Sequence, residues 1–444
     1  VGARNIISGN SDTGVNILGS SATNNTVQGN YIGTDITGNV ALGNGYQGIF
    51  VNNAPNNLIG GTAAGAGNVI SANDGGIMIF DASDGTTIQG NLIGTNAAGT
   101  AALGNNHMGF WIANAQHILI GGTTPGARNV ISGNGPIFAF GIYFNENARN
   151  NTVQGNFIGT DITGTQAIGN GTGGVAMMRS SDNLIGGNTP AARNIISGNI
   201  GVGVAIAGNG LPGDPVTPSD NNVIQGNYIG TDVTGTVAVP NQENGINVSN
   251  GFGNGVHNNI IGGSGPGEGN LISGNGSAGI IIDTGAVGTQ VLGNIIGLNA
   301  TGTASIPNNP NGVIIPDGVN STIGGTTVGA GNVIAGNVKG IVVVQYSGTA
   351  NQNQILGNSI YANTILGIDL GDDGVTENDA GDTDDGANNM QNTPVLTGAE
   401  ATNTTIQISG TLNSQASKIY RVEFFANPVC HPSGSGEGKF YLGF

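Results

Sequence analysis

Charge, cysteine and long apolar runs are all scarce in this sequence of 444 residues. Charged residues make up 8% of it, and 9 Lys and Arg face 26 Asp and Glu, which gives a formal net charge of −17. So few cations cannot form the basic surface that nucleic-acid recognition requires, so we expect no nucleic-acid partner. The absence of a run of about 20 apolar residues excludes a membrane span. The single cysteine, Cys430, excludes an intrachain disulfide, so the cysteine content does not tell whether the protein works in an oxidising or a reducing compartment.

Glycine and asparagine dominate what is present. The sequence holds 84 Gly and 63 Asn, and the glycines keep no period of three, which excludes a collagen-like chain. Hydrophobic residues make up 37% and recur periodically, so the chain can fill a core and is not disordered. The sequence starts at Val1, inside a repeat and without Met. We therefore expect it to be an excised segment of a longer protein.

Three short phrases repeat along the chain, and repetition at this length is typical of solenoid proteins. The first phrase, N-[IVL]-I-[SA]-[GA]-N, starts at Asn5, Asn68, Asn129, Asn194, Asn270 and Asn332. The second phrase, [QL]-G-N-x-I-G, has its Asn at Asn30, Asn91, Asn156, Asn227 and Asn294. The third phrase, I-G-G, starts at Ile59, Ile120, Ile185, Ile261 and Ile323.

A finer unit lies inside these phrases. A Gly followed by a β-rich strand, with apolar residues at the first and third positions, occurs twelve times from Gly14 to Gly367, about 32 residues apart on average. An Asn precedes each of these glycines, usually by four residues; the set is Asn10, Asn44, Asn73, Asn105, Asn134, Asn170, Asn199, Asn241, Asn275, Asn308, Asn337 and Asn363. Asn tolerates left-handed turns and its amide bonds to backbone. We expect these side chains to stack as an amide ladder along one corner.

These features predict an all-β fold, a solenoid of about twelve stacked β-coils. At about 4.8 Å per coil the rod would be roughly 58 Å long. We place the solenoid at residues 1–368 and the last coil with an acidic linker at 369–393. A small β module follows at 394–444. About 50 residues are too few for a whole β-sandwich, so we expect either a truncated β-sandwich or a cap on the last coil.

The repeats resemble those of right-handed parallel β-helix proteins in the pectate-lyase-like superfamily. More narrowly, Asn30–Asn44 and Asn156–Asn170 are similar to the N-x-I-G-T-D-x-T-G-x-x-A-x-G-N repeat of bacterial extracellular and surface proteins. The resemblance covers about residues 1–392. It implies a single-stranded right-handed parallel β-helix, an extracellular or cell-surface location and a bacterial source. The narrower group looks largely non-catalytic.

The second position after each repeat Gly should point outward, since alternate strand residues face opposite sides. On the second to fifth coils that position holds Phe50, Met78, Trp111 and Tyr143, and on the ninth to eleventh it holds Ile281, Ile314 and Val342. An exposed apolar stripe of this size marks a partner or ligand surface, and aromatic platforms suit sugar rings. The alternative is cover from within the chain, for instance by the Pro136–Phe140 insertion.

Non-repeated polar residues near this stripe suggest a catalytic alternative. A glycosidase needs two carboxylates about 5–10 Å apart, and Asp81 and Glu146 are expected two coils, about 10 Å, apart. A lyase would use a base such as Arg179 beside Glu146, and His107 is a further candidate. Sugar-cleaving enzymes that share the resembled fold use this strand face. Neighbouring surface charges are more often a solvated face.

The segment 369–385 concentrates carboxylates that could bind Ca²⁺, which takes six to eight oxygen ligands. The candidate ligands are Asp369, Asp372, Asp373, Asp379, Asp382 and Asp384. The spacing does not match an EF-hand, and a solvated linker is the alternative. Elsewhere, Asp35, Asp161 and Asp232 recur in the I-G-T-D loop with Asn96 and Asn299 at equivalent places, which indicates turn-closing acceptors. Arg4, Arg128 and Arg193 recur in the A-R-N phrase, where we expect them to brace loops.

Two functions of different classes follow from the sequence. The first is a non-catalytic extracellular or cell-surface scaffold that binds glycan or other copies of itself through the apolar stripe. The regular repeats, the missing catalytic motifs and the scarcity of Lys favour it. The second is a polysaccharide lyase or glycoside hydrolase that acts in a groove on the outward face of the strand after each repeat Gly. Ca²⁺ is the one cofactor either function would use.

Overall fold

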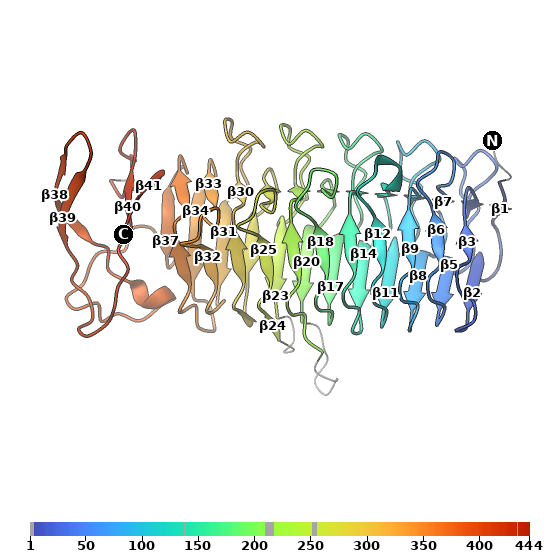
Figure 1. Ribbon diagram of the computed structural model, residues 1–444, viewed down its shortest axis with the longest axis horizontal. Helices are drawn as coiled ribbons and strands as arrows, with labels where there is room; N and C mark the ends of the chain where they lie inside the picture. The colour runs from blue at the N-terminus through green and yellow to red at the C-terminus, as the bar shows by residue number, and fades with distance from the viewer. Residues whose placement is uncertain (1–3, 137–138, 209–216, 251–254, 433) are drawn as a thin grey trace.

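The computed structural model describes residues 4–136, 139–208, 217–250, 255–432 and 434–444. Within these residues the chain forms an elongated rod, with its strands side by side along the axis and two β-hairpins beyond one end (Figure 1). The described residues contain no α-helix, only the 3-10 helices η1 (Pro125–Ala127) and η2 (Ala387–Met390). None of their helices is long and apolar enough to cross a membrane.

Three parallel sheets form the rod, and successive strands of the rod enter the three sheets in turn, except for one short pair that lies outside them. The first sheet contains β1 (Ile6–Ile7), β4 (Tyr31–Ile32), β7 (Val69–Ile70), β10 (Leu92–Ile93), β13 (Val130–Ile131), β16 (Phe157–Ile158), β19 (Ile195–Ile196), β22 (Tyr228–Ile229), β26 (Leu271–Ile272), β30 (Ile295–Ile296), β33 (Val333–Ala335) and β36 (Ser359–Tyr361). The second sheet contains β2 (Val15–Leu18), β5 (Gln47–Asn52), β8 (Gly75–Phe80), β11 (Phe110–Ala113), β14 (Phe140–Asn145), β17 (Gly173–Met178), β20 (Val202–Ala207), β23 (Ile246–Ser249), β27 (Ile280–Ile282), β31 (Asn311–Pro316), β34 (Lys339–Val344) and β37 (Leu366–Leu370).

The third sheet has one strand fewer than the other two. It contains β3 (Thr26–Val27), β6 (Leu58–Gly60), β9 (Thr87–Gln89), β12 (Leu119–Gly121), β15 (Thr152–Gln154), β18 (Leu184–Gly186), β21 (Val223–Gln225), β25 (Ile260–Gly262), β29 (Gln290–Leu292), β32 (Thr322–Gly324) and β35 (Gln354–Leu356). The short pair β24 (Val256–His257) and β28 (Ala286–Val287) lies outside the three sheets. Each turn of chain thus adds one strand to each sheet. The chain is a right-handed parallel β-helix, as the repeats predict.

In-register stacking of equivalent apolar residues builds the core. Ile49 pairs with Ile77, Ile77 with Phe110 and Phe110 with Ile142 along the second sheet. These four side chains are fully buried and belong to one continuous cluster that runs through the rod. Burying each side chain of this size contributes about 1.5–3 kcal/mol. A coil alone cannot bury them, so the stack is stable only as a whole.

Two unbroken asparagine ladders follow two corners of the coil. The predicted ladder from Asn10 to Asn363 is confirmed: each Nδ2 donates to the next Oδ1 at 2.7–3.4 Å. A second ladder from Asn5 to Asn358 was not predicted as one feature, and its distances are 2.8–3.2 Å. It interleaves the asparagines of the first and second repeat phrases. The two phrases are therefore one corner on successive coils.

The I-G-T-D loops form a further stack outside the first sheet. Ala97, Ile162, Val233 and Ala300 each donate their backbone N–H to a glycine carbonyl of the preceding loop at 2.9–3.0 Å. Asp161 accepts backbone N–H groups of its own loop, and Asn299 does the same in its loop. The expected turn-closing role is confirmed. The loops stand out along the upper edge of Figure 1.

The chain after β37 covers the last coil and supplies acceptors there, one of which continues the ladder that ends at Asn363. Glu437 Oε1 accepts both the backbone N–H and Nδ2 of Asn363, at 3.0 and 2.9 Å. Glu423 Oε2 accepts the Gly357 N–H at 2.7 Å. Two antiparallel hairpins lie in this region, β38 (Val395–Ala401) with β39 (Ile406–Thr411), and β40 (Phe424–Ala426) with β41 (Phe440–Gly443). Glutamates thus take the place of a next coil at two corners.

Candidate functional site

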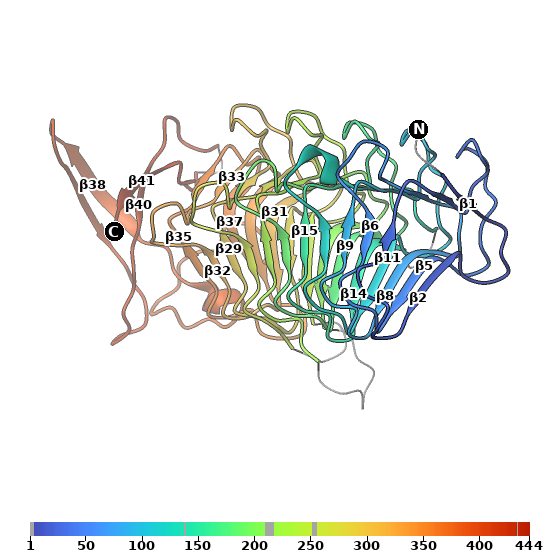
Figure 2. The same ribbon diagram turned by 45° about the vertical axis from the view of Figure 1, so that its right-hand side comes forward.

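A row of large side chains lies on the outer face of the second sheet. The register places Phe50 beside Met78, Met78 beside Trp111 and Trp111 beside Tyr143, as the sequence predicts. Figure 2 shows the strands that carry the row, β5, β8, β11 and β14, lying side by side. Because parallel strands are about 4.8 Å apart, the row spans about 15 Å along the rod.

Aromatic contacts join this row into one surface. Phe80 lies edge-to-face between Phe50 and Trp111, with ring centroids 6.0 and 5.2 Å away. Trp111 meets Tyr143 at 6.2 Å, and Phe140 stacks on Tyr143 with the two rings 13° from parallel. We call Phe50, Phe80, Trp111, Tyr143 and Phe140 the aromatic platform. Edge-to-face and offset pairs of this kind are the favoured geometries for aromatic rings.

The platform is less exposed than the sequence predicted. Met78 is buried, at 8% exposed, and Phe50, Trp111 and Tyr143 are half-buried. The rings cover one another, and Phe140, with Ala176, Val202 and Ala205, forms a small cluster outside the main core. The expected cover by the Pro136–Phe140 insertion is thus seen for Phe140, while Ile137 and Phe138 lie outside the described residues. The surface offered to a ligand is mainly ring edges and half-open ring faces.

Two polar atoms of the platform are unusual for a buried aromatic layer. The Trp111 Nε1 is buried and has no hydrogen-bond partner among the described residues. An unpaired buried donor costs about 1–3 kcal/mol. Burial raises the pKa of the Tyr143 hydroxyl, with Arg179 lowering it and Glu146 raising it further. Tyr143 is therefore protonated at neutral pH and keeps its O–H as a donor.

Polar residues stack at the turns where these strands end. Asp81, Asn114, Glu146 and Arg179 directly follow β8, β11, β14 and β17, each with a φ between 39° and 51°. Left-handed backbone is uncommon for residues such as Glu and Arg, and strain of this kind gathers at functional sites. Asn114 Nδ2 donates to Asp81 Oδ1 at 3.0 Å, and the Asn114 N–H donates to the Glu146 carbonyl. The turns are therefore held in register.

Arg179 contacts two residues of the preceding coil beside the platform. Its Nε donates to Asn145 Oδ1 at 3.1 Å, and its Nη2 lies 3.5 Å from Glu146 Oε1. Asp81 and Glu146 lie two coils apart with Asn114 between them, which corresponds to about 10 Å. The structure thus brings three predicted residues, Asp81, Glu146 and Arg179, to one edge of the platform.

His107 does not join them. It precedes β11, whereas the other three candidates follow their strands, and its Nδ1 lies 3.2 Å from Asp74 Oδ1. The seven residue steps from His107 to Asn114 correspond to about 20 Å of extended chain. His107 belongs to the opposite edge of the sheet.

Two residues of this site, Phe80 and Asn145, were missed from the sequence. Phe80 lies two residues after Met78, so the alternation that placed Met78 outward should have placed Phe80 there as well. Asn145 is buried at the equivalent outward position of β14 and holds Arg179. Phe140 was expected only as part of the covering insertion, because strict alternation counted back from Ile142 would turn it inward.

The six predicted metal ligands fall into separate groups. Lys339 Nζ lies 2.7 Å from Asp369 Oδ2 and 2.6 Å from Asp372 Oδ1. Burial lowers the pKa of Lys339, but hydrogen bonds and charges of the two carboxylates outweigh it and raise the pKa. These two carboxylates therefore serve an ion pair. Among the described residues, Asp379, Asp382 and Asp384 have ligand atoms within 4.8 Å of one another, and Asp373 is not part of this group.

The group of three could hold a metal ion. Asp382 is buried and accepts the Asn392 N–H at 2.8 Å and Gln391 Nε2 at 2.9 Å. Hydrogen bonds from Thr383 lower the pKa of Asp379, although burial acts the other way. Asp384 Oδ1 is buried and has no hydrogen-bond partner among the described residues. A carboxylate oxygen in that state is available to a cation.

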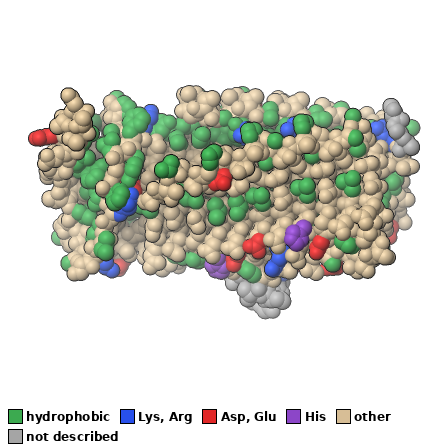
Figure 3. Space-filling view, in the orientation of Figure 1, with side chains coloured by type: hydrophobic (Ala, Val, Ile, Leu, Met, Phe, Trp, Pro, Cys, Tyr) green, Lys and Arg blue, Asp and Glu red, His purple; other side chains and the backbone are tan. Residues whose placement is uncertain are grey.

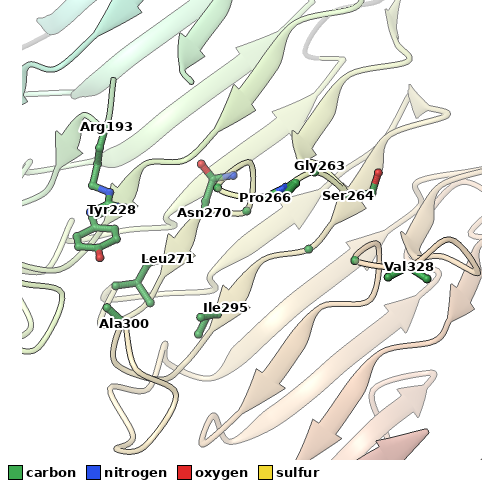
Figure 4. A pocket seen from close by; sticks show the side chains of 15 residues that line it. Arg193, Tyr228, Gly263, Ser264, Pro266, Asn270, Leu271, Ile295, Ala300 and Val328 are labelled. Carbon is green, nitrogen blue, oxygen red and sulfur yellow. The ribbon is translucent and has the colours of Figure 1, made fainter. Parts of the chain in front are cut away.

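A hollow of about 640 Å³ lies elsewhere on the rod, against the loop 263–269 (Figure 4). Arg128 and Arg193 stack on Phe157 and Tyr228 at 4.1 and 4.0 Å, which confirms their predicted role as loop braces. In the next repeat Gly269 replaces the arginine and Ile295 the aromatic ring, and both line the hollow. The hollow is the space that a missing brace leaves.

Charged groups are sparse on the face that Figure 3 presents, where most of the surface is neutral. Charged side chains in that view are scattered, with basic groups along the upper edge, a mixed group of acidic, basic and His side chains along the lower edge, and others near the C-terminal end of the rod. The net charge of −17 comes from only 9 Lys and Arg and 26 Asp and Glu among 444 residues.

Comparison with known proteins yields similarity to solved structures only. No family model matches the chain, and no curated protein matches it. The chain is similar to the Dettilon tailspike protein, with 16% identity over 86% of this chain and 67% of that one, and a TM-score of 0.47. It is also similar to PfbA, a surface adhesin of Streptococcus pneumoniae, with 12% identity, 92% and 90% coverage and a TM-score of 0.43.

A third similar structure is the A-module of a mannuronan C-5 epimerase from Azotobacter vinelandii. The identity is 15%, with 82% of this chain and 86% of that module covered, and the TM-score is 0.38. The names of these proteins include both an adhesin and an enzyme. The likeness therefore does not distinguish a binding scaffold from a catalyst.

Proposed function

We propose that this chain is a non-catalytic extracellular scaffold that binds a carbohydrate chain across the aromatic platform. The observation that carries the proposal is the joined row of aromatic rings on successive coils, edged by Asp81, Asn114, Glu146 and Arg179. Ring surfaces suit the C–H faces of sugars, and a few placed polar groups fix their orientation. The stacked coils hold both sets rigidly, so little ordering free energy is lost on binding.

Self-association through the same surface is the weaker form of the proposal. A stable interface buries about 800 Å² on each partner. Met78, Ala176 and Ala205 are buried within the chain, and the remaining rings are half-covered. A narrow row of half-open rings suits a thin polymer better than a flat second copy.

Catalysis is the alternative, and the neighbouring pair of Glu146 and Arg179 is the observation that favours it. A general acid needs a carboxyl group whose pKa is raised in an apolar pocket. Glu146 has 54% of its side chain exposed, and Asp81 is exposed as well. Solvated carboxylates support binding better than proton transfer.

Titration calorimetry with a glycan panel tests the binding proposal. We expect Trp111→Ala and Tyr143→Ala each to weaken binding at least about tenfold, equivalent to about 1.4 kcal/mol. Tyr346→Ala is the matched control, because Tyr346 is an exposed ring outside the platform. A panel without any ligand, or equal losses in the control, would contradict the proposal.

Product release separates the scaffold from the enzyme. The same glycans are incubated with the protein, and reducing ends and unsaturated products are measured. The proposal expects no product above background. Products that disappear in Glu146→Gln would establish the catalytic alternative instead.

We also propose that Asp379, Asp382 and Asp384 bind Ca²⁺. The support is their mutual proximity together with the buried, unpaired Oδ1 of Asp384. Binding to the folded state adds about 2.7 kcal/mol at a hundredfold excess over Kd. A chelator should therefore lower the melting temperature, and Asp384→Asn should remove this sensitivity. Asp385→Asn is the matched control, and a melt insensitive to chelator would refute the site.

A further inference from the structure

We infer that the platform takes a neutral, hydroxyl-rich glycan and rejects polyanionic ones such as uronate polymers. The inference rests on the proposed function and concerns the class of sugar. It follows from the balance of charge around the platform, whereas the binding proposal uses the same residues only as polar groups that orient a sugar.

Carboxylates outnumber cations beside the platform. The turns that follow β8, β11, β14 and β17 carry four carboxylates and two guanidinium groups, namely Asp81, Asp84, Glu146, Asp182, Arg149 and Arg179. The whole chain, including these residues, carries a net charge of −17. A polyanion would approach against this field, and the repulsion lowers both its association rate and its affinity.

The two guanidinium groups are already engaged. Arg179 donates to Asn145 and lies beside Glu146, and only 21% of its side chain is exposed. Arg149 donates its Nη2 to Asn147 Oδ1 on the same turn, and its Nε is buried without a partner among the described residues. A sugar carboxylate would have to displace these partners to form the bidentate pair that makes arginine selective for acids.

Neutral sugars find complementary groups at the same place. Their hydroxyls donate to carboxylates, and hydrogen bonds to an ionised acceptor are about twice as strong as neutral ones. Asp81 and Glu146 supply exposed acceptors. The protonated Tyr143 hydroxyl supplies a donor toward sugar oxygens. An acceptor-rich edge beside aromatic rings therefore matches hydroxyls rather than carboxylates.

The test compares oligosaccharides of both classes by titration calorimetry. The neutral probes are hexamers of cellulose, xylan, mannan and N-acetylchitin, and the acidic probes are hexamers of galacturonate and mannuronate. Each is measured at about 20 mM and about 500 mM NaCl, because salt screens charge–charge attraction. Each is also measured with and without Ca²⁺, which could bridge carboxylates.

We expect at least one neutral hexamer to bind, with less than about a twofold change in affinity across this salt range. Its affinity should fall at least about tenfold in Trp111→Ala. Binding of an acidic hexamer, with or without Ca²⁺, would overturn the inference but leave the carbohydrate-binding proposal standing. Binding of neither class would defeat both.

A charge-neutral variant sharpens the outcome. Asp81→Asn with Glu146→Gln keeps the size of both side chains but removes the ionised acceptors and leaves the Arg179 charge unbalanced. We expect weaker binding of the neutral hexamer and the appearance of salt-sensitive binding of the acidic ones. An unchanged neutral affinity in a variant with unchanged melting temperature would refute the role of the carboxylates.

Discussion

The asparagine corners and the outer face of the second sheet belong to the same coils, yet only the corners repeat without interruption. In the ladder from Asn5 to Asn358 every coil carries the same amide. On the face, the equivalent position changes from Phe50 to Ala176 to Asn247 to Asp369 along the rod. A buried corner position must both donate and accept hydrogen bonds at a fixed spacing, so few residue types other than Asn fit there. A position on the outer face of a sheet accepts many residue types. Positions that vary between coils are therefore where function can be placed.

The third corner of the coil repeats less strictly than the two asparagine ladders. Asparagines link Asn151 to Asn183 and Asn222 to Asn259 there, but Thr86, Thr289 and Ser321 occupy other coils. The hydroxyl of Thr86 donates to the Ser83 carbonyl on its own coil. A local hydrogen bond therefore replaces the rung at Thr86, whereas the buried hydroxyls of Thr289 and Ser321 have no partner among the described residues.

The strongest way to break the comparison is to remove one rung from an unbroken ladder. Asn156 Oδ1 accepts the N–H and Nδ2 of Asn129, and its own Nδ2 donates to the Ile120 carbonyl and Asn194 Oδ1. Asn156→Ala leaves several of these buried groups unpaired, at about 1–3 kcal/mol each. We expect a loss of at least about 4 kcal/mol, measured by denaturant unfolding.

Asn183→Thr is the control for this prediction. Asn183 lies on the third corner, where threonine already occurs, so the loss should be clearly smaller. Equal losses at the two corners would show that the unbroken ladder is no more important than the broken one.

A smaller effect is expected on the face itself, at the coil where an ion pair replaces the apolar row. Asp369 is fully buried and faces Lys339 Nζ at 2.7 Å. Lys339→Met leaves an uncompensated buried carboxylate, which costs about 3 kcal/mol or more. The additional change Asp369→Asn should restore most of the melting temperature. A single variant as stable as the parent protein would show that water compensates the carboxylate.

The parts of the fold that the sequence predicted are those that repeat. The coil count, the sheet register of Trp111 and Tyr143, and the Asn10 corner all followed from spacing alone. The Asn5 corner was missed as one ladder because its residues are split between two phrases. Chain distances between its successive rungs vary, since loops of different length intervene.

The exposure of the platform could not be predicted in the same way. Whether Met78 is open depends on how the rings around it turn, which is a property of packing between coils rather than of position in a strand. The metal candidates fall into separate groups for a related reason. Asp369 and Asp379 are close in sequence, but the chain leaves the last coil between them, and Lys339 comes from the coil before.

A third prediction concerns Trp111, whose effect on stability should be small. Trp111→Phe keeps a ring between Phe80 and Tyr143 and removes the unpaired N–H. The lost contact area and the relieved desolvation penalty, about 1–3 kcal/mol, oppose each other. We expect a net change within about 1 kcal/mol together with weaker glycan binding. A large loss of stability with unchanged binding would mean that Trp111 is structural.

The smallest effect is expected where the repeat itself exchanges Asp for Asn. Burial raises the pKa of Asp161, but backbone hydrogen bonds from Gln166 and Thr165 and the Thr163 hydroxyl outweigh it and hold the pKa below 3.8. A depressed folded pKa means that the ionised group stabilises the fold fully above the unfolded value, and that this contribution is lost as the pH falls through the folded one. Asp161→Asn should therefore lower the melting temperature slightly at pH 6, and the difference from the parent should shrink as the pH falls below 3.8. Asn96 accepts the Thr100 N–H in the same way, which explains why the amide suffices. A difference that stays constant from pH 6 to pH 2 would show that the charge of Asp161 contributes nothing to the turn.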